Sequence, residues 1–159
     1  MSKEQVVYWR AVYPALSLCV AIAFPGTSWS ETDQDMETTI RQLYADFSQT
    51  WCNHKKMSKF FTETLARDTA NACDTDLIGM EVGVPIILRQ DYDEKEIMRT
   101  LNINCVNRAK PTCMAIFNNF GTTNTVKYHL IKKSGTWLIS DVIDEQGFSY
   151  RESLSEALK

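Results

Sequence analysis

Alternation of apolar and polar residues dominates the second half of the chain, over residues 101–143. Short polar turns divide this stretch at Arg108–Lys110, at the GTTN sequence of 121–124 and at the KKSG sequence of 132–135. Period-two alternation is typical of half-buried strands, and short turns join antiparallel neighbours. The pattern therefore predicts a four-stranded antiparallel meander.

Apolar residues recur instead at helical spacing in the earlier part of the chain. One apolar stripe runs through residues 33–51 and a second runs through residues 55–73. A shorter segment near the C-terminus opens with Ser149 and Glu152, which are spaced as in a capping box. The spacing predicts two N-terminal helices and a short C-terminal helix. Helices followed by a run of strands indicate an α+β fold, with the helices packed on the sheet.

The stretch between the predicted helices and strands is broken by Gly79, Gly83 and Pro85. Within it, we expect the apolar run Val84–Leu88 to enter the core or to lie at a sheet edge. The sequence DYDEKE, residues 91–96, is expected to form a solvated acidic turn, and we expect the strand region to begin at Ile97. It lacks the glycine and the terminal glutamate that a calcium-binding EF-hand loop requires.

Residues 1–30 differ from the rest of the chain. Two basic residues precede the apolar run AVYPALSLCVAIAF at 11–24, and the small residues Ser28 and Ser30 follow it. This order is typical of a secretory signal peptide, so we expect cleavage near Ser30 and a single mature domain over residues 31–159. The run is short for a membrane span, which makes an uncleaved anchor the weaker alternative. A periplasmic protein without a stable membrane anchor is expected.

The charge of the expected mature domain bears on its partners. Residues 31–159 carry 15 Lys or Arg and 19 Asp or Glu, which gives a net charge of −4. Nucleic-acid binding depends on cations that neutralise phosphates, so an acidic domain without a basic stripe argues against a nucleic-acid partner. The sequence also lacks glycine-rich phosphate loops and dinucleotide fingerprints, and we expect no cofactor.

Four cysteines remain after the expected cleavage, and an even number in a small exported domain indicates two disulfides. Cys105 and Cys113 flank the predicted turn centred on Ala109, which places them directly opposite each other at a separation that a disulfide can bridge. The remaining pair, Cys52 and Cys73, would then join the two helices. A zinc site is the alternative, but the sequence has no CxxC pair and no histidines at ligand spacing, so no metal is expected.

Three segments carry a resemblance to a known family: ILRQDYD at 87–93, YHLIKKSGTWLISDVID at 128–144 and SYRESL at 149–154. Together with the order of helices and strands, they resemble the nuclear-transport-factor-2-like superfamily, and within it a family of bacterial envelope proteins. The resemblance implies a cone-shaped α+β fold, in which a curved sheet wraps around long helices and leaves a pocket at its open end. It carries over no catalytic residue, because no Asp–His pair of that superfamily can be matched here.

The predicted hairpin around Ser134 and Gly135 places Tyr128 opposite Asp141 on its more apolar face. A carboxylate on that face must be hydrogen-bonded or protonated. One hypothesis is a binding pocket formed by Asp141, Tyr128 and Trp137. The alternatives are a structural acid bonded to Tyr128 or to a helix terminus, an acid wetted at the mouth of the cone, and a register slip that turns Asp141 outward.

The sequence contains no hydrolase or metalloenzyme motif, which favours a protein that binds rather than catalyses. The leading expectation is a periplasmic inhibitor, most concretely an immunity protein against a secreted toxin that degrades the cell wall. Two loops are candidates for contact with that partner: the GTTN tip, and the acidic segment of Asp91, Tyr92, Asp93 and Glu94. One alternative is an envelope accessory protein with a small ligand in the cone pocket, and another is a hydrolase or isomerase with Asp141 as its base.

Overall fold

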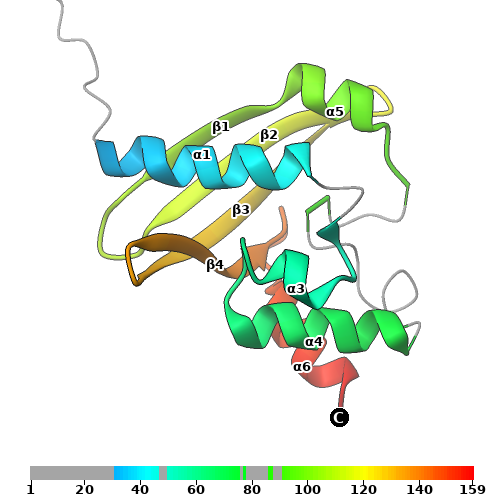
Figure 1. Ribbon diagram of the computed structural model, residues 1–159. Helices are drawn as coiled ribbons and strands as arrows, with labels where there is room; N and C mark the ends of the chain where they lie inside the picture. Colours follow the sequence, from blue (N-terminus) through cyan, green and yellow to red (C-terminus); the bar gives the residue numbers. More distant parts are fainter. Residues whose placement is uncertain (1–30, 47–49, 76, 78–85, 88–90) are drawn as a thin grey trace, which may run out of the picture.

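The computed structural model describes residues 31–46, 50–75, 77, 86–87 and 91–159. The predicted signal peptide, residues 1–30, lies outside these ranges. Helices pack against one four-stranded sheet, which confirms the predicted α+β class (Figure 1). Within the described ranges, no helix has the length and apolar character needed to cross a membrane.

The sheet consists of β1 (Asn102–Val106), β2 (Thr112–Asn119), β3 (Thr122–Lys133) and β4 (Thr136–Ile143). Neighbouring strands are antiparallel and their spatial order is the chain order, so the predicted meander is confirmed. The turn between β2 and β3 lies at Phe120 and Gly121, earlier than the predicted GTTN turn. The reason is that Thr122–Asn124 already pair with β2.

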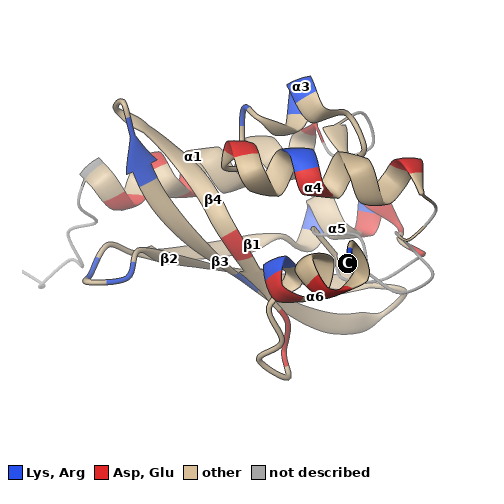
Figure 2. Ribbon diagram, turned by 90° about the horizontal axis from the view of Figure 1, so that it is seen from below, with Lys and Arg blue, Asp and Glu red and all other residues tan. Residues whose placement is uncertain are grey.

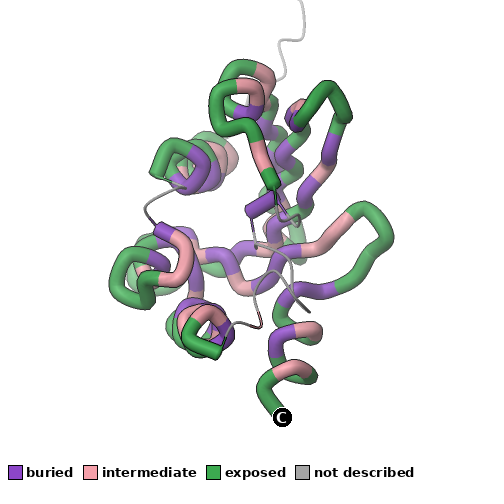
Figure 3. The backbone as a smooth tube through the Cα atoms, turned by 90° about the vertical axis from the view of Figure 1, so that its right-hand side faces the viewer, coloured by how far each residue is buried: buried purple, intermediate pink, exposed green. Residues whose placement is uncertain are grey.

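Alternation along the strands gives the sheet a buried inner face. Helix α1 (Glu31–Ala45) crosses this face and contacts β1, β2 and β4. Its predicted apolar stripe is buried at Met36, Ile40, Leu43 and Tyr44. Figure 3 shows buried positions on the facing sides of helices and strands, with exposed positions turned outward. Each large apolar side chain in such a core contributes about 1.5–3 kcal/mol to the free energy of folding.

Helix α1 is shorter than predicted, because it ends at Ala45 rather than at Trp51. Of the residues predicted to complete its stripe, Phe47 lies outside the described residues. Trp51 is partly buried against the core without being part of α1. The apolar run Val84–Leu88 is described only at Ile86 and Ile87, both of which are buried in the core.

The prediction of one helix over residues 55–73 is wrong, because the helix is interrupted after Met57 and resumes at Glu63. The observed helices are α3 (His54–Met57) and α4 (Glu63–Asp74). Between them, the Phe60 carbonyl accepts the Ile139 N–H over 2.7 Å, and the Thr62 N–H donates to the Ile139 carbonyl over 2.9 Å. The segment between the helices therefore satisfies backbone groups on the outer edge of β4, which a continuous helix could not do.

The acidic segment is more ordered than the solvated turn predicted for it. It leads into helix α5 (Glu94–Thr100), whose N-cap Asp93 accepts the Glu96 N–H over 3.1 Å. Ile97 of this helix is buried, and α5 packs on β2. The predicted change from turn to strand at Ile97 is therefore wrong, and the first strand begins at Asn102.

Both predicted disulfides are present, one joining Cys52 to Cys73 and the other joining Cys105 to Cys113. Cys105 and Cys113 are direct partners in the β1–β2 register, with their Cα atoms 4.0 Å apart. The other bond links the chain just before α3 to the last turn of α4. Two disulfides in a small domain are typical of proteins that lie outside the reducing cytoplasm.

The chain ends with α6 (Tyr150–Ala157), which packs against α4 and β4. The Tyr150 side chain is buried, and its hydroxyl donates to the Thr69 hydroxyl of α4 over 3.3 Å. The predicted short C-terminal helix is therefore confirmed.

Candidate functional site

Asp141 does not face Tyr128 in the structure. The pairing of β3 with β4 follows the predicted register from the turn as far as Ile139, and then shifts by one residue at a β-bulge. Asp141 therefore pairs with His129, and Tyr128 pairs with Val142, so the predicted Tyr128–Asp141 pair is wrong. The bulge lets the apolar Ile139 and Val142 both enter the core, while Asp141 turns to the other face.

Asp141 instead holds the first turn of α6. Its carboxylate accepts a hydrogen bond of 2.8 Å from the Ser149 hydroxyl and one of 3.1 Å from the Arg151 N–H. It also accepts the Val142 N–H over 2.9 Å. The Ser149 hydroxyl oxygen in turn accepts the Glu152 N–H over 3.1 Å, which confirms Ser149 as the N-cap. These contacts match the alternative in which a helix terminus satisfies a structural acid.

His129, the cross-strand neighbour of Asp141, is partly buried among cations. Loss of solvent lowers the pKa of His129 below its ordinary value, and the nearby Lys110 lowers it further. The Asp141 carboxylate raises this pKa, while Lys127 and Arg151 lower it. The neutral imidazole is therefore favoured. Among the described contacts, the side chains of His129 and Asp141 are not joined by a hydrogen bond, so they do not form an acid–base pair.

Tyr128 lies in the core, where its hydroxyl belongs to a buried polar triangle. The hydroxyl oxygens of Tyr44 and Tyr128 are 2.9 Å apart. The Ile86 carbonyl oxygen lies 3.0 Å from the Tyr44 hydroxyl and 3.1 Å from the Tyr128 hydroxyl. Burial raises the pKa of both phenols well above the ordinary value, so both remain neutral. The two rings fill the interior rather than line an opening.

Trp137 is buried as well, with the Lys132 Nζ atom 5.4 Å from the centre of its ring. Its indole N–H is a buried donor without a hydrogen-bond partner among the residues that the structure describes. Two surface clefts occur between described residues, and neither is lined by Asp141, Tyr128 or Trp137. These three residues thus line neither of the two clefts, and their role in binding stays a prediction.

The two loops predicted to contact a partner come together. The Asn119 side chain at the end of β2 accepts the Asp93 N–H over 2.8 Å and donates to the Asp91 carbonyl over 3.0 Å. The Glu96 carboxylate accepts the Gly121 N–H of the β2–β3 turn, with both oxygens at 3.2 Å. The hairpin side chain Asn119 thus bonds to the acidic segment, and the Glu96 side chain at the end of that segment bonds to the hairpin turn.

We call this joint surface, residues 91–96 together with Phe120 and Gly121, the acidic tip. It lies at one end of the sheet, where Figure 2 shows the acidic residues of α5 and the preceding segment close together. The acidic tip contains one cationic side chain, Lys95, and four carboxylates, those of Asp91, Asp93, Glu94 and Glu96. The acidic tip therefore presents a net negative charge.

Phe120 is the apolar part of the acidic tip, with 64% of the residue exposed and a φ of +50°. A bulky residue rarely adopts this left-handed conformation, which costs about 1–2 kcal/mol. The β3–β4 hairpin has a turn of the same length, but there Ser134 and Gly135 occupy the two positive-φ positions. The turn predicted at residues 121–124 left Phe120 in a strand, although Phe-Gly between two alternating runs is the position of a two-residue turn.

A cleft of about 510 Å³ adjoins the acidic tip and shares Glu94 with it. A second cleft, of about 290 Å³, lies between β3 and the loop that follows β4, where Thr125 and Glu145 are among its lining residues. The Glu145 carboxylate accepts the Thr125 N–H over 2.7 Å, so its charge is already engaged. The first cleft is therefore the stronger candidate for a ligand.

No family model, no curated protein and no solved structure matches this chain. The resemblance to the nuclear-transport-factor-2-like superfamily accordingly stays a prediction. Across the described ranges, His, Cys, Asp and Glu side chains form no group of three or more that could hold a metal ion. The acidic tip and the adjoining cleft are therefore the features of the structure that bear on function.

Proposed function

We propose that this protein is an exported, non-enzymatic inhibitor that binds a basic protein partner through the acidic tip. The observation that carries the proposal is Phe120, an aromatic side chain that is exposed to solvent and held at positive φ beside Gly121, whose N–H the Glu96 carboxylate accepts. Strained backbone conformations cluster at functional sites, and aromatic side chains are frequent centres of binding energy in protein interfaces. Burial of Phe120 by a partner would offset the cost of exposing this side chain at positive φ.

The chemistry of the acidic tip defines the partner. An apolar pocket would receive the Phe120 ring, and Lys or Arg side chains around that pocket would meet Asp91, Asp93 and Glu94. Charge complementarity of this kind accelerates encounter and selects among partners, while the central aromatic supplies affinity. A cationic enzyme that degrades the cell wall fits this description, since a basic cleft attracts an acidic plug as it attracts an acidic substrate. The protein would then act as the immunity protein of that enzyme.

The acidic tip is also organised before binding. The Asn119 side chain fixes the segment around Asp91 and Asp93, and Glu96 fixes the β2–β3 turn. A surface whose backbone is already ordered loses little conformational entropy when it binds. This property is expected of an inhibitor that inserts into an enzyme cleft.

The proposed location follows from the cysteines. Both disulfides need an oxidising compartment to persist. With cleavage of a signal peptide near Ser30, we place the mature protein in the periplasm, where a toxin directed at the cell wall would act.

The test uses Phe120→Asn, with Ser134→Asn as the matched control in the other two-residue turn. Asparagine tolerates positive φ, so both variants should keep or increase the stability of the fold. Only Phe120→Asn should weaken partner binding, by at least about 30-fold if Phe120 contributes about 2 kcal/mol or more.

Each protein, exported from its full-length chain, would be immobilised and exposed to envelope extracts that contain secreted wall hydrolases. The expected partner is retained by the wild type and by Ser134→Asn, is lost by Phe120→Asn, and is inhibited in an assay of wall degradation. Equal retention of that partner by Phe120→Asn would overturn the proposal.

A further inference from the structure

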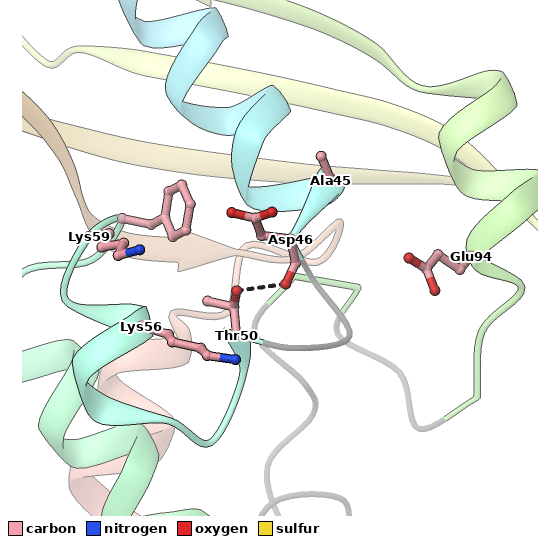
Figure 4. A pocket seen from close by; sticks show the side chains of 7 residues that line it. Ala45, Asp46, Thr50, Lys56, Lys59 and Glu94 are labelled. Carbon is pink, nitrogen blue, oxygen red and sulfur yellow. Dashed lines mark hydrogen bonds between the residues drawn. The ribbon is translucent and has the colours of Figure 1, made fainter.

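The charged residues that line the cleft of about 510 Å³ come from three separate parts of the chain. Asp46 directly follows α1, Lys56 and Lys59 come from α3 and the turn after it, and Glu94 begins α5. Figure 4 shows the two lysines on one side, Glu94 on the opposite side and Asp46 between them. Among the described lining residues, two positive and two negative side chains therefore surround one hollow.

These four charged side chains do not neutralise one another. Neither carboxylate lies within ion-pair distance of either ammonium group, and none of the four side chains forms a hydrogen bond with another described residue. Opposite charges do pair elsewhere, as in Arg41 with Glu37 at 2.7 Å. The cleft thus keeps its cations apart from its anions and leaves both free for a ligand.

The remaining lining residues give the cleft a firm, partly apolar wall. Phe60 is almost fully buried and contributes the edge of the core, and Ala45 lies at the end of α1. The Thr50 hydroxyl donates to the Asp46 carbonyl over 2.6 Å, which ties two lining segments together. A ligand would therefore meet charges on opposite sides and a small apolar surface between them.

We propose that this cleft binds a small zwitterion, namely an amino acid or a short peptide with a free carboxylate and a free ammonium group. Lys56 and Lys59 would bind the carboxylate, Asp46 and Glu94 would bind the ammonium group, and short aliphatic side chains would contact Phe60. The volume falls within the range of about 300–1,000 Å³ found for small-molecule sites. Hydrogen bonds between ionised groups are roughly twice as strong as neutral ones, so both ends of the ligand contribute.

The arrangement of signs argues against other ligands. A polyanion would approach the two lysines but would be repelled by Asp46 and Glu94. A polycation would be attracted by Asp46 and Glu94 but repelled by the two lysines. A neutral ligand would leave desolvated charges without partners. Only a ligand that carries both charges satisfies both sides at once.

The experiment is a heteronuclear NMR titration of the exported protein with the dipeptide alanyl-alanine. Two capped forms, the N-acetyl peptide and the C-terminal amide, serve as matched probes that each lack one charge. We expect concentration-dependent shifts of the amide signals of Lys56, Lys59 and Glu94 with the free peptide. Either cap should weaken binding by about tenfold, since each removes one charge-assisted contact.

A pair of lysine variants tests the position of the site. Lys59→Met removes a lining charge and keeps the length of the side chain, whereas Lys55→Met alters an exposed lysine of α3 that does not line the cleft. Lys59→Met should weaken the free peptide by about tenfold and Lys55→Met should leave it unchanged. Absence of shifts, equal binding of a capped peptide, or equal effects of the two variants would each overturn the inference.

The cleft and the acidic tip share Glu94, so the variants that separate this inference from the proposed inhibitor function lie at other residues. Phe120→Asn should leave binding of the dipeptide unchanged, because Phe120 does not line the cleft. Lys59→Met should conversely leave the protein partner bound. Failure of one proposal is therefore distinguishable from failure of the other.

Discussion

The hydroxyl of Ser149 donates a hydrogen bond of 2.8 Å to the carboxylate of Asp141, and this bond joins the start of α6 to β4. The same carboxylate accepts the Arg151 N–H, so a negative charge lies at the end of the helix where the helix dipole favours it. Tyr150, the first residue of α6, also bonds to Thr69 of α4. Asp141 is thus part of the connection that holds α6 against the domain.

Replacement of Asp141 tests this connection. Asp141→Ala leaves the Ser149 hydroxyl and the Arg151 N–H without their acceptor, and we expect it to lower the free energy of unfolding by about 2–4 kcal/mol. Asp141→Asn keeps one acceptor oxygen and should cost less. Urea denaturation gives the stability, and hydrogen exchange at the Arg151 amide reports whether α6 detaches first. Asp144→Ala is the control, because among the described residues the Asp144 carboxylate accepts only the Phe148 N–H of an exposed loop.

The Asp141 prediction would be contradicted by a cost no larger than that of Asp144→Ala. Intact protection of the Arg151 amide in Asp141→Ala would also contradict it.

The buried triangle of Tyr44, Tyr128 and the Ile86 carbonyl should show non-additive energetics. Two hydroxyl hydrogens serve three oxygen–oxygen contacts, so either tyrosine alone can still donate to the carbonyl. Tyr44→Phe and Tyr128→Phe should each cost about 1 kcal/mol or less, and the double variant should cost about 1–2 kcal/mol more than their sum. Denaturation of the four proteins measures this coupling. Tyr150→Phe combined with Tyr44→Phe should be additive, and a purely additive Tyr44–Tyr128 pair would refute the triangle.

The two disulfides should differ in the stability that they contribute. Loop-closure entropy predicts about 3.3 kcal/mol for the Cys52–Cys73 bond, which closes a sequence separation of 21, and about 2.5 kcal/mol for Cys105–Cys113, with a separation of 8. Paired Cys→Ala variants, compared by urea denaturation, give both values. The reverse order would mean that the loop-closure account does not hold for this protein.

His129 should make stability depend on pH. Its pKa in the folded protein lies below the unfolded value of 6.5, so the unfolded chain binds the proton first as the pH falls. Stability should therefore decrease on acidification through about pH 6.5 and stop decreasing from this cause below the folded pKa. We expect His129→Gln to reduce the slope of unfolding free energy against pH, measured from about pH 5 to about pH 8. Lys110→Gln should reduce it in part, since Lys110 also lowers the pKa of His129.

An unchanged slope in His129→Gln would assign the titration to another group. A slope of the opposite sign, with stability increasing on acidification, would contradict the direction of the shift itself.

The strands were predictable because local alternation and turn residues determine them. The β3–β4 register could be derived from the turn at Ser134 and Gly135 only as far as Ile139. Beyond that point β4 contains one extra residue, and the register of the remaining pairs depends on which side chains pack in the core. Val142 is 0% exposed and occupies the position that a regular register would give to Asp141. Tertiary packing, which a single strand pattern does not contain, decided this pairing.

The helices were less predictable for a related reason. The helix predicted from apolar spacing includes Phe60 and Thr62, yet their backbone groups bond to Ile139, a residue far away in the sequence. The candidate site needed the same long-range information. The acidic segment and the β2–β3 turn were considered as separate loops, and only the contacts of Asn119 and Glu96 bring them together. The pairing of cysteines was predictable because one hairpin turn fixes which sulfurs face each other.

The short segment that pairs with Ile139 has a further consequence for the behaviour of the protein at high concentration. An uncovered edge strand is a template to which a strand of another chain can add, and this is a common route to aggregation. In this protein the Phe60–Thr62 segment occupies that edge, and the Cys52–Cys73 bond holds the chain on both sides of it. Reduction of this bond would therefore lower stability and would also release the Phe60–Thr62 segment from the edge of β4. The exposed edge would then favour self-association.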